Sequence, residues 1–95
     1  MLETYEADST KQFTFQSSIA PDSAPRFCVY NGSGTLIGSL TSASSDSTHY
    51  YAMMTVSSTE GIYVGEWYAV STVNGDVYPF YKRELFNVVR TRSYT

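Results

Sequence analysis

Cysteine, histidine and charged residues are scarce in this sequence of 95 residues. Cys28 and His49 are the only residues of their types, and charged residues make up 16% of the chain. A single cysteine cannot form an intrachain disulfide or supply a cysteine-based zinc site. A single histidine leaves little material for nucleophilic catalysis. We therefore expect a non-enzymatic protein with no catalytic residues, no bound metal and no cofactor.

Positive charge and long apolar runs are also in short supply. The formal net charge is −3 and the sequence pI is near 4.8, whereas a nucleic-acid-binding domain usually presents a basic face. No apolar run is long enough to span a bilayer, and the acidic first eleven residues do not resemble a signal peptide. We expect neither nucleic acid nor a membrane as a partner.

Residues that favour strands and turns are abundant. Serine, threonine, tyrosine and valine number 14, 11, 9 and 8, and this composition argues against a helical bundle. Turn residues divide the sequence into seven expected strands, at residues 11–19, 26–30, 35–40, 49–56, 62–73, 77–81 and 85–91. Short strands at this spacing indicate an antiparallel β-sandwich, with a small barrel as the alternative. We expect an N-terminal arm at 1–10, one sandwich domain at 11–92 and a tail at 93–95.

Alternation of apolar and polar residues identifies the side chains that should face the core. The expected core residues are Phe13, Phe15, Phe27, Val29, Leu36, Tyr63, Trp67, Phe86 and Val88. Asn74 and Gly75 tolerate positive φ and predict a tight hairpin. Pro79 cannot donate to a strand ladder, so its strand should lie at a sheet edge or contain a bulge.

Three segments resemble immunoglobulin-like sandwich domains. In Glu60-Gly61-Ile62-Tyr63-Val64-Gly65-Glu66-Trp67, a glycine and a tyrosine precede a tryptophan, as at the entry to a strand in many such domains. The resemblance implies that the Tyr63 hydroxyl ties this corner to upstream backbone. The hairpin-like segment from Phe27 to Leu36 and the closing Leu85-Phe86-Asn87-Val88-Val89 are similar to other parts of these domains.

The arrangement resembles the small immunoglobulin-like structural proteins of tailed bacteriophages, found in heads, necks and tails. The resemblance implies a multi-copy virion protein, synthesised in the host cytoplasm, whose partners are other virion structural proteins or further copies of itself. Antibody-type domains pair two cysteines around a strand tryptophan. Cys28 has no such partner in this sequence, which argues against antibody-like kinship but not against the sandwich.

Two sets of residues have side-chain types that occur in catalytic sites, but neither is expected to form one. Asp46, Ser47 and His49 contain the residue types of a catalytic triad, but they are too close in sequence to converge on a substrate. Glu60 and Glu66 could act as paired carboxylates, but they are expected in a turn and on a solvated strand face. His49 should lie at a strand entry, and Cys28 should be a small core or interface side chain.

Aromatic residues, at 16% of the chain, exceed what a thin core can hide. Tyrosine suits interfaces because it offers a large contact area and a polar tip. The expected interface residues are Leu2, Tyr5, Tyr51, Tyr78, Tyr81, Arg90 and Arg92. We expect the arm to become ordered only in an assembly, with Tyr5 buried against a neighbouring chain. The alternative is a carbohydrate- or host-surface-binding module that uses Trp67 and the tyrosines.

Overall fold

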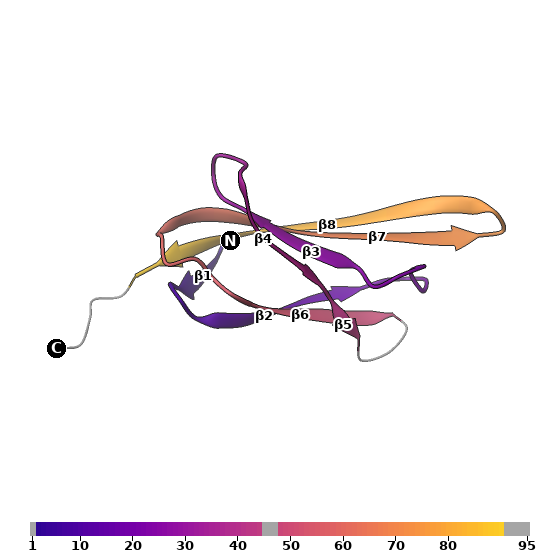
Figure 1. Ribbon diagram of the computed structural model, residues 1–95, viewed down its shortest axis with the longest axis horizontal. Helices are drawn as coiled ribbons and strands as arrows, with labels where there is room; N and C mark the ends of the chain where they lie inside the picture. Colours follow the sequence, from indigo (N-terminus) through magenta and orange to yellow (C-terminus); the bar gives the residue numbers. More distant parts are fainter. Residues whose placement is uncertain (1, 45–47, 91–95) are drawn as a thin grey trace.

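The computed structural model describes residues 2–44 and 48–90, which form two β-sheets (Figure 1). In chain order the strands are β1 (Glu3–Glu6), β2 (Thr10–Gln16), β3 (Arg26–Tyr30), β4 (Leu36–Thr41), β5 (Ala43–Ser44), β6 (His49–Thr55), β7 (Gly61–Val73) and β8 (Asp76–Val89). The described residues include no helix, and so none long and apolar enough to cross a membrane. The all-β prediction is confirmed, with eight strands in place of about seven.

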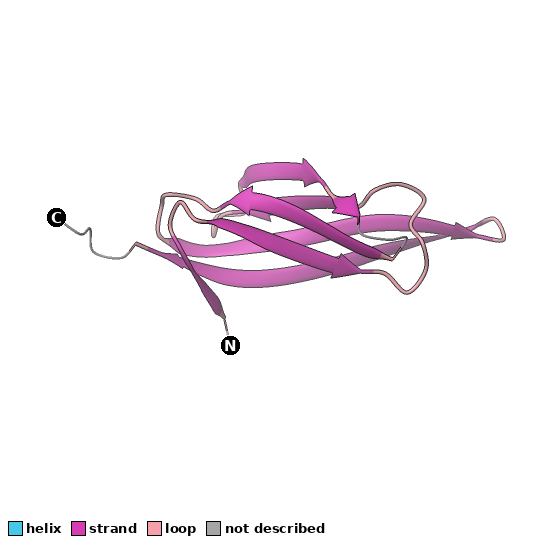
Figure 2. Cartoon of the chain, turned by 90° about the horizontal axis from the view of Figure 1, so that it is seen from below, coloured by secondary structure: helices cyan, strands magenta, loops and turns pink. Residues whose placement is uncertain are grey.

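The strands are arranged in a five-stranded and a three-stranded sheet. The larger sheet has the order β1-β8-β7-β3-β4 and the smaller has the order β2-β6-β5. β1 runs parallel to β8, and the other neighbours are antiparallel. The β7–β8 hairpin runs past the shorter strands at one end of the molecule (Figures 1 and 2).

Aromatic side chains from both sheets form the core. The Phe27 ring stacks on Phe13 with centroids 4.6 Å apart and lies 4.8 Å from Trp67, which in turn stacks on Phe15. Trp67 is fully buried. Eight of the nine residues expected in the core are buried, the exception being Leu36. The alternation of each strand therefore identifies the face that packs against the other sheet.

Leu36 corrects one expectation, because 52% of its surface is exposed. Val29 pairs with Gly38, but Tyr30 pairs with Leu36, so the register shifts and Ile37 is the extra residue of a bulge in β4. Such a bulge reverses the side-chain alternation that follows from a regular ladder. Leu36 consequently lies beside Tyr30 and faces away from the core.

The expected strands at 77–81 and 85–91 are one continuous strand, β8. It pairs with β7 without interruption from Asp76 opposite Val73 to Val88 opposite Gly61. The residues between the two expected strands, Lys82, Arg83 and Glu84, carry no turn signal and continue the ladder. The predicted hairpin at Asn74 and Gly75 is present, with φ angles of 52° and 85°.

The N-terminal segment is part of the fold, which corrects the expectation of a free arm. Residues 3–6 form β1, and Ala7 N donates to Val89 O at 2.8 Å. Tyr5 packs on this chain's own Phe13 and Phe86, with ring centroids 5.8 and 5.1 Å away. Its apolar contacts are therefore made within the chain rather than with a neighbour. The expected tail at 93–95 lies outside the described residues.

Candidate functional site

The residues considered for catalysis do not come together. His49 is exposed, and its Nδ1 lies 3.2 Å from the Thr48 hydroxyl; Asp46 and Ser47 lie outside the described residues. Glu60 accepts a hydrogen bond from Arg90 N, whereas Glu66 forms an ion pair with Arg83 at 2.7 Å. In the part of the chain that the structure describes, no three His, Cys, Asp or Glu side chains cluster as a metal site would require.

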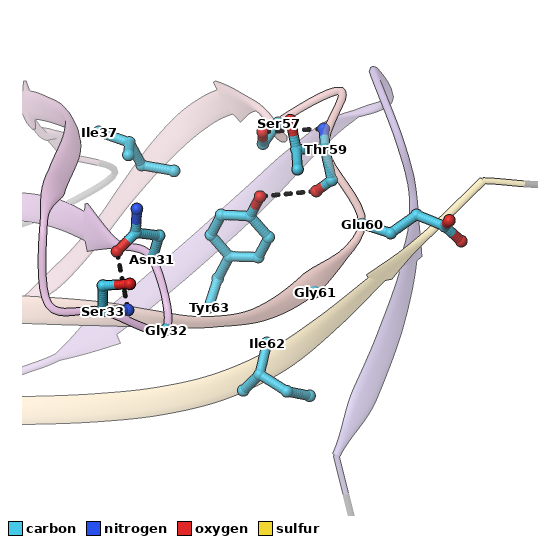
Figure 3. Close-up of a pocket in the computed structure, with 10 residues that line it drawn as sticks. All are labelled: Asn31, Gly32, Ser33, Ile37, Ser57, Thr59, Glu60, Gly61, Ile62 and Tyr63. Carbon is cyan, nitrogen blue, oxygen red and sulfur yellow. Dashed lines mark hydrogen bonds between the residues drawn. The ribbon is translucent and has the colours of Figure 1, made fainter.

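A hollow of about 360 Å³ lies beside Tyr63, where the β3–β4 and β6–β7 turns meet (Figure 3). The Tyr63 hydroxyl donates to Thr59 O at 2.6 Å, which confirms the expected corner. Asn31 Oδ1 accepts bonds from Ser33 N and Thr35 N, and the Glu60 side chain points away from Tyr63 (Figure 3). These polar groups hold the turns in place, so the hollow is a structural feature of the corner.

The outer face of the five-stranded sheet, turned away from the three-stranded sheet, is rich in apolar side chains. One row of paired residues crosses the four strands β4, β3, β7 and β8. In that order it consists of Leu36, Tyr30, Val64 and Leu85. Ile62 borders this row, and together with Tyr30, Val64 and Leu85 it lines a concavity of about 550 Å³. A contiguous apolar area of this kind on a small domain marks a surface that can bind a partner.

Toward the hairpin tip, the Glu66–Arg83 ion pair separates this apolar row from a pair of tyrosines on the same face. Tyr68 and Tyr81 face each other with ring centroids 5.1 Å apart. Every side chain from residue 72 to residue 79 is exposed.

One edge of β8 is partly unpaired. β3 pairs with β7 at residues 64–68 of β7, and β1 pairs with β8 at residues 86–89 of β8. Within the described chain, no strand lies beside residues 76–85 of β8 on the side away from β7.

The residues expected at an interface are not gathered in one place. Tyr78 and Tyr81 are exposed on β8, Leu2 is exposed before β1, and Tyr51 is half-buried on β6. Tyr5, as described above, packs on the core of its own chain.

Of the two arginines of that set, Arg90 does not offer free charge to a neighbour. Arg90 donates to Ser58 O at 2.5 Å and lies 3.8 Å from Asp8, so its charge is engaged within the chain. Arg92 lies outside the described residues.

The predicted interface did not include five exposed residues of this face, namely Leu36, Ile62, Tyr68, Val77 and Leu85. The alternation within residues 76–89 could have identified Val77 and Leu85, because both occupy the same face of the strand as Tyr81. The alternative expectation that Trp67 stacks on a sugar is wrong, because its ring is fully buried.

Two tyrosines have raised pKa values. Burial, followed by the charges of Glu3 and Glu84, raises the pKa of Tyr5 above 10.0. At Tyr30 the pKa is raised chiefly by electrostatic interaction with Cys28, with smaller contributions from burial and Glu66. Both shifts disfavour the charged phenolate form of these side chains.

Comparisons of the chain with protein-family models, with curated proteins and with solved structures give no match.

Proposed function

We propose that this chain is a non-enzymatic assembly module that docks on neighbouring proteins in many copies. The observation that carries the proposal is the uncovered edge of β8, together with the apolar outer face that it borders. An unpaired strand edge offers backbone donors and acceptors to another chain, and adjacent apolar side chains add contact area.

An immunoglobulin-like topology is part of this proposal. The smaller sheet joins the second, sixth and fifth strands, and the larger sheet contains the eighth, seventh, third and fourth in that order. Variable-type immunoglobulin domains join their B, E and D strands and their G, F, C and C′ strands in the same way. The Tyr63 corner at the start of β7 also supports this assignment.

Gly65 explains how such a domain can lack its disulfide. In antibody domains the second cysteine lies two residues after the corner tyrosine, and here that position is Gly65. A Cβ at Gly65 would lie 2.8 Å from Cζ of Phe27, so the phenylalanine ring occupies the space beside this glycine. Stacked aromatic rings thus take the place of a covalent link between the sheets.

We further propose that the assembly is the virion of a tailed bacteriophage, with other virion proteins or further copies of this chain as neighbours. The sequence resemblance to small structural proteins of such phages supports this identity. The engagement of Glu60, Glu66 and Tyr63 in holding turns and strands is consistent with a structural role.

The proposal is tested by replacing the gene in its own genome and measuring incorporation of the chain into purified particles. Wild type should co-purify with particles at a constant ratio to the major structural proteins. The double variant Val77→Asp with Tyr81→Asp should lose at least about tenfold in occupancy, which corresponds to about 1.4 kcal/mol. Met53→Asp, at an exposed apolar residue of the other sheet, is the matched control. Absence of the wild-type chain from particles would overturn the virion assignment.

A further inference from the structure

The space between the two sheets is poorly filled on the side where β4 and β6 approach each other. β5 pairs with only two residues of β6, and in the described chain no strand lies beside the rest of β6 on that side. In β4, the residue that faces the core opposite Val29 is Gly38, which has no side chain. The bulge at Ile37 turns Leu36 outward. β4 therefore contributes little apolar volume to this part of the core.

A pocket of about 150 Å³ lies between the sheets at this point. The aromatic part of its wall is continuous, because the Phe86 ring centroid lies 5.6 Å from that of Phe13 and 5.8 Å from that of Tyr63. None of the residues that line the pocket is charged. The lining residues that are buried are Phe13, Val29, Val56, Tyr63 and Phe86.

The three polar side chains that line the pocket already have partners within the chain. The Tyr63 hydroxyl donates to Thr59 O at 2.6 Å, and Ser57 Oγ accepts from Thr59 N at 3.1 Å. The Thr55 hydroxyl lies 3.0 Å from that of Thr10. A polar ligand would have to compete with these bonds, whereas an apolar group gives up no hydrogen bond on entering. The chemistry of the lining therefore favours an apolar occupant.

The pocket opens toward the hollow beside Tyr63. The two spaces share Ile37, Ser57 and Tyr63 as lining residues, and these three side chains come together around the Tyr63 ring (Figure 3). Ile37 is 45% exposed, whereas Tyr63 is buried, so Ile37 lies at the rim of the pocket and Tyr63 lies deeper. A small molecule can thus reach the aromatic wall from solvent through the hollow.

Met54 is the adaptable part of the pocket wall. Its thioether lies against the backbone of β4, because a Cβ at Gly38 would be 3.1 Å from Met54 Cε and 3.4 Å from its Sδ. Methionine is unbranched and changes rotamer readily to fit irregular spaces. Met54 can therefore adjust to an occupant while the aromatic rings on the other side stay in place.

We propose that this pocket binds a small molecule through one apolar group of about the size of a benzene ring. An engineered apolar cavity of about 150 Å³ in another protein stays dry and binds benzene or xenon. Here the aromatic wall adds favourable ring–ring contacts. The inference concerns a site on the opposite side of the molecule's core from the edge of β8, and it does not depend on the proposed assembly function.

Methyl NMR of the full chain, with benzene as the probe, tests the site directly. Benzene should shift the methyl signals of Met54, Val29 and Val56 in a saturable way, and xenon under pressure should shift the same signals. Met53 is the matched control, because it precedes Met54 on β6, faces the other side of the sheet and is 53% exposed. Equal shifts at Met53 and Met54, or shifts that do not saturate, would overturn the proposal.

Gly38→Val should block the site, because the new side chain would take the space beside the Met54 thioether and drive it into the pocket. The affinity for benzene should fall at least about tenfold. Ser39→Val is the matched control, since this neighbour on β4 faces the outer side of the sheet opposite Cys28, and it should bind benzene as wild type does. A folded Gly38→Val protein with undiminished affinity would contradict the assigned position.

Met54→Ala keeps the proposal testable if Gly38→Val does not fold. It enlarges the pocket, so it should bind naphthalene, which has two fused rings, at least about tenfold more tightly than wild type does. Met53→Ala removes the same atoms from the outer face and should not gain this affinity. Equal naphthalene binding by the two variants would also contradict the assigned position.

Incorporation of Gly38→Val into particles tests whether the apolar group belongs to a small molecule. Its occupancy should equal that of Ser39→Val, because a small molecule makes no link to a neighbouring protein. A lower occupancy would assign the group to a side chain of a neighbour and overturn the small-molecule assignment. A wild-type chain that enters particles but does not bind benzene would overturn this inference and leave the proposed assembly function intact, so the two failures are distinguishable.

Discussion

The base and the tip of the β7–β8 hairpin have the same backbone pairing but very different surroundings. At the base, Tyr63, Trp67, Phe86 and Val88 alternate inward and are buried beneath the three-stranded sheet. At the tip, every side chain from residue 72 to residue 79 is exposed. Strand pairing alone therefore does not determine burial, which depends on whether the second sheet extends far enough to cover the hairpin.

This difference separates the residues that stabilise the fold from the residues that are available to bind a partner. Apolar burial at the base contributes to folding at roughly 25 cal/mol per Å², whereas the tip offers apolar area that the chain itself does not use. Substitutions at the base should lower the free energy of unfolding, and substitutions at the tip should change association while leaving folding almost unchanged. Substitutions in the two regions test that separation.

Trp67→Ala should lower the free energy of unfolding by about 3–5 kcal/mol, because it removes a fully buried ring and leaves a cavity between Phe15 and Phe27. Tyr78→Ala at the tip is the control and should change stability by less than about 0.5 kcal/mol. Urea unfolding followed by circular dichroism measures both. Equal losses for the two variants would show that the tip contributes to folding as much as the base.

Gly65→Ala should cost about 1–3 kcal/mol by overpacking the base. The added Cβ would lie 2.8 Å from Cζ and 3.0 Å from Cε1 of Phe27, and that ring is held between Phe13 and Trp67. Gly32→Ala is the matched control, since the nearest atom to its added Cβ is Ile62 O at 3.5 Å. Thermal unfolding of both proteins decides the matter, and a melting temperature for Gly65→Ala as high as that of the control would contradict the tight packing.

Tyr63→Phe should cost about 1 kcal/mol, because it removes the hydroxyl that donates to Thr59 O and leaves the ring in place. The loss is confined to one corner at the base, so it should be smaller than that of Trp67→Ala. Chemical unfolding midpoints compare the two proteins. If Tyr63→Phe unfolds at the same denaturant concentration as wild type, the corner bond contributes nothing to stability.

Local patterns in the sequence predicted much of the fold. Alternation placed β3, β6 and β7 within one residue of their observed ends, and it assigned Phe13, Phe15, Trp67 and Phe86 to the core. These predictions succeeded because the side-chain period of a strand is a local property. The turn at Asn74 and Gly75 was recognised for the same reason, since only a few residue types tolerate positive φ.

The errors concern features that depend on pairing between distant segments. The bulge that turns Leu36 outward is a property of the β3–β4 register, and the parallel pairing of β1 with β8 joins the two ends of the chain. The interface prediction named Tyr78 and Tyr81, which are exposed, and their contact with a partner stays a prediction. It could not identify the open edge of β8, because that edge depends on where the pairing of β1 with β8 begins.

Tyr5 lies where β1 covers the base of β8, and it gives the smallest predicted effect. Burial, then Glu3 and Glu84, raise its pKa above the ordinary value of 10.0, which the unfolded chain should show. Below that pH the phenol is protonated in both states, so its contribution to stability is fully present. As the pH rises through 10.0 and toward the folded pKa, the unfolded state loses its proton first and stability falls.

Tyr5→Phe should therefore differ from wild type by less than about 0.5 kcal/mol at neutral pH and should lose less stability on the alkaline side. Urea unfolding at a series of pH values above and below 10 gives the free energy of unfolding of both proteins. Because both contain the other tyrosines, the contributions of those tyrosines cancel in the difference between the two values. Glu3→Gln should reduce the alkaline loss in part, because Glu3 is the second cause of the shift. Parallel pH profiles for wild type and Tyr5→Phe would show that β1 does not hold Tyr5 against the core at the base of β8.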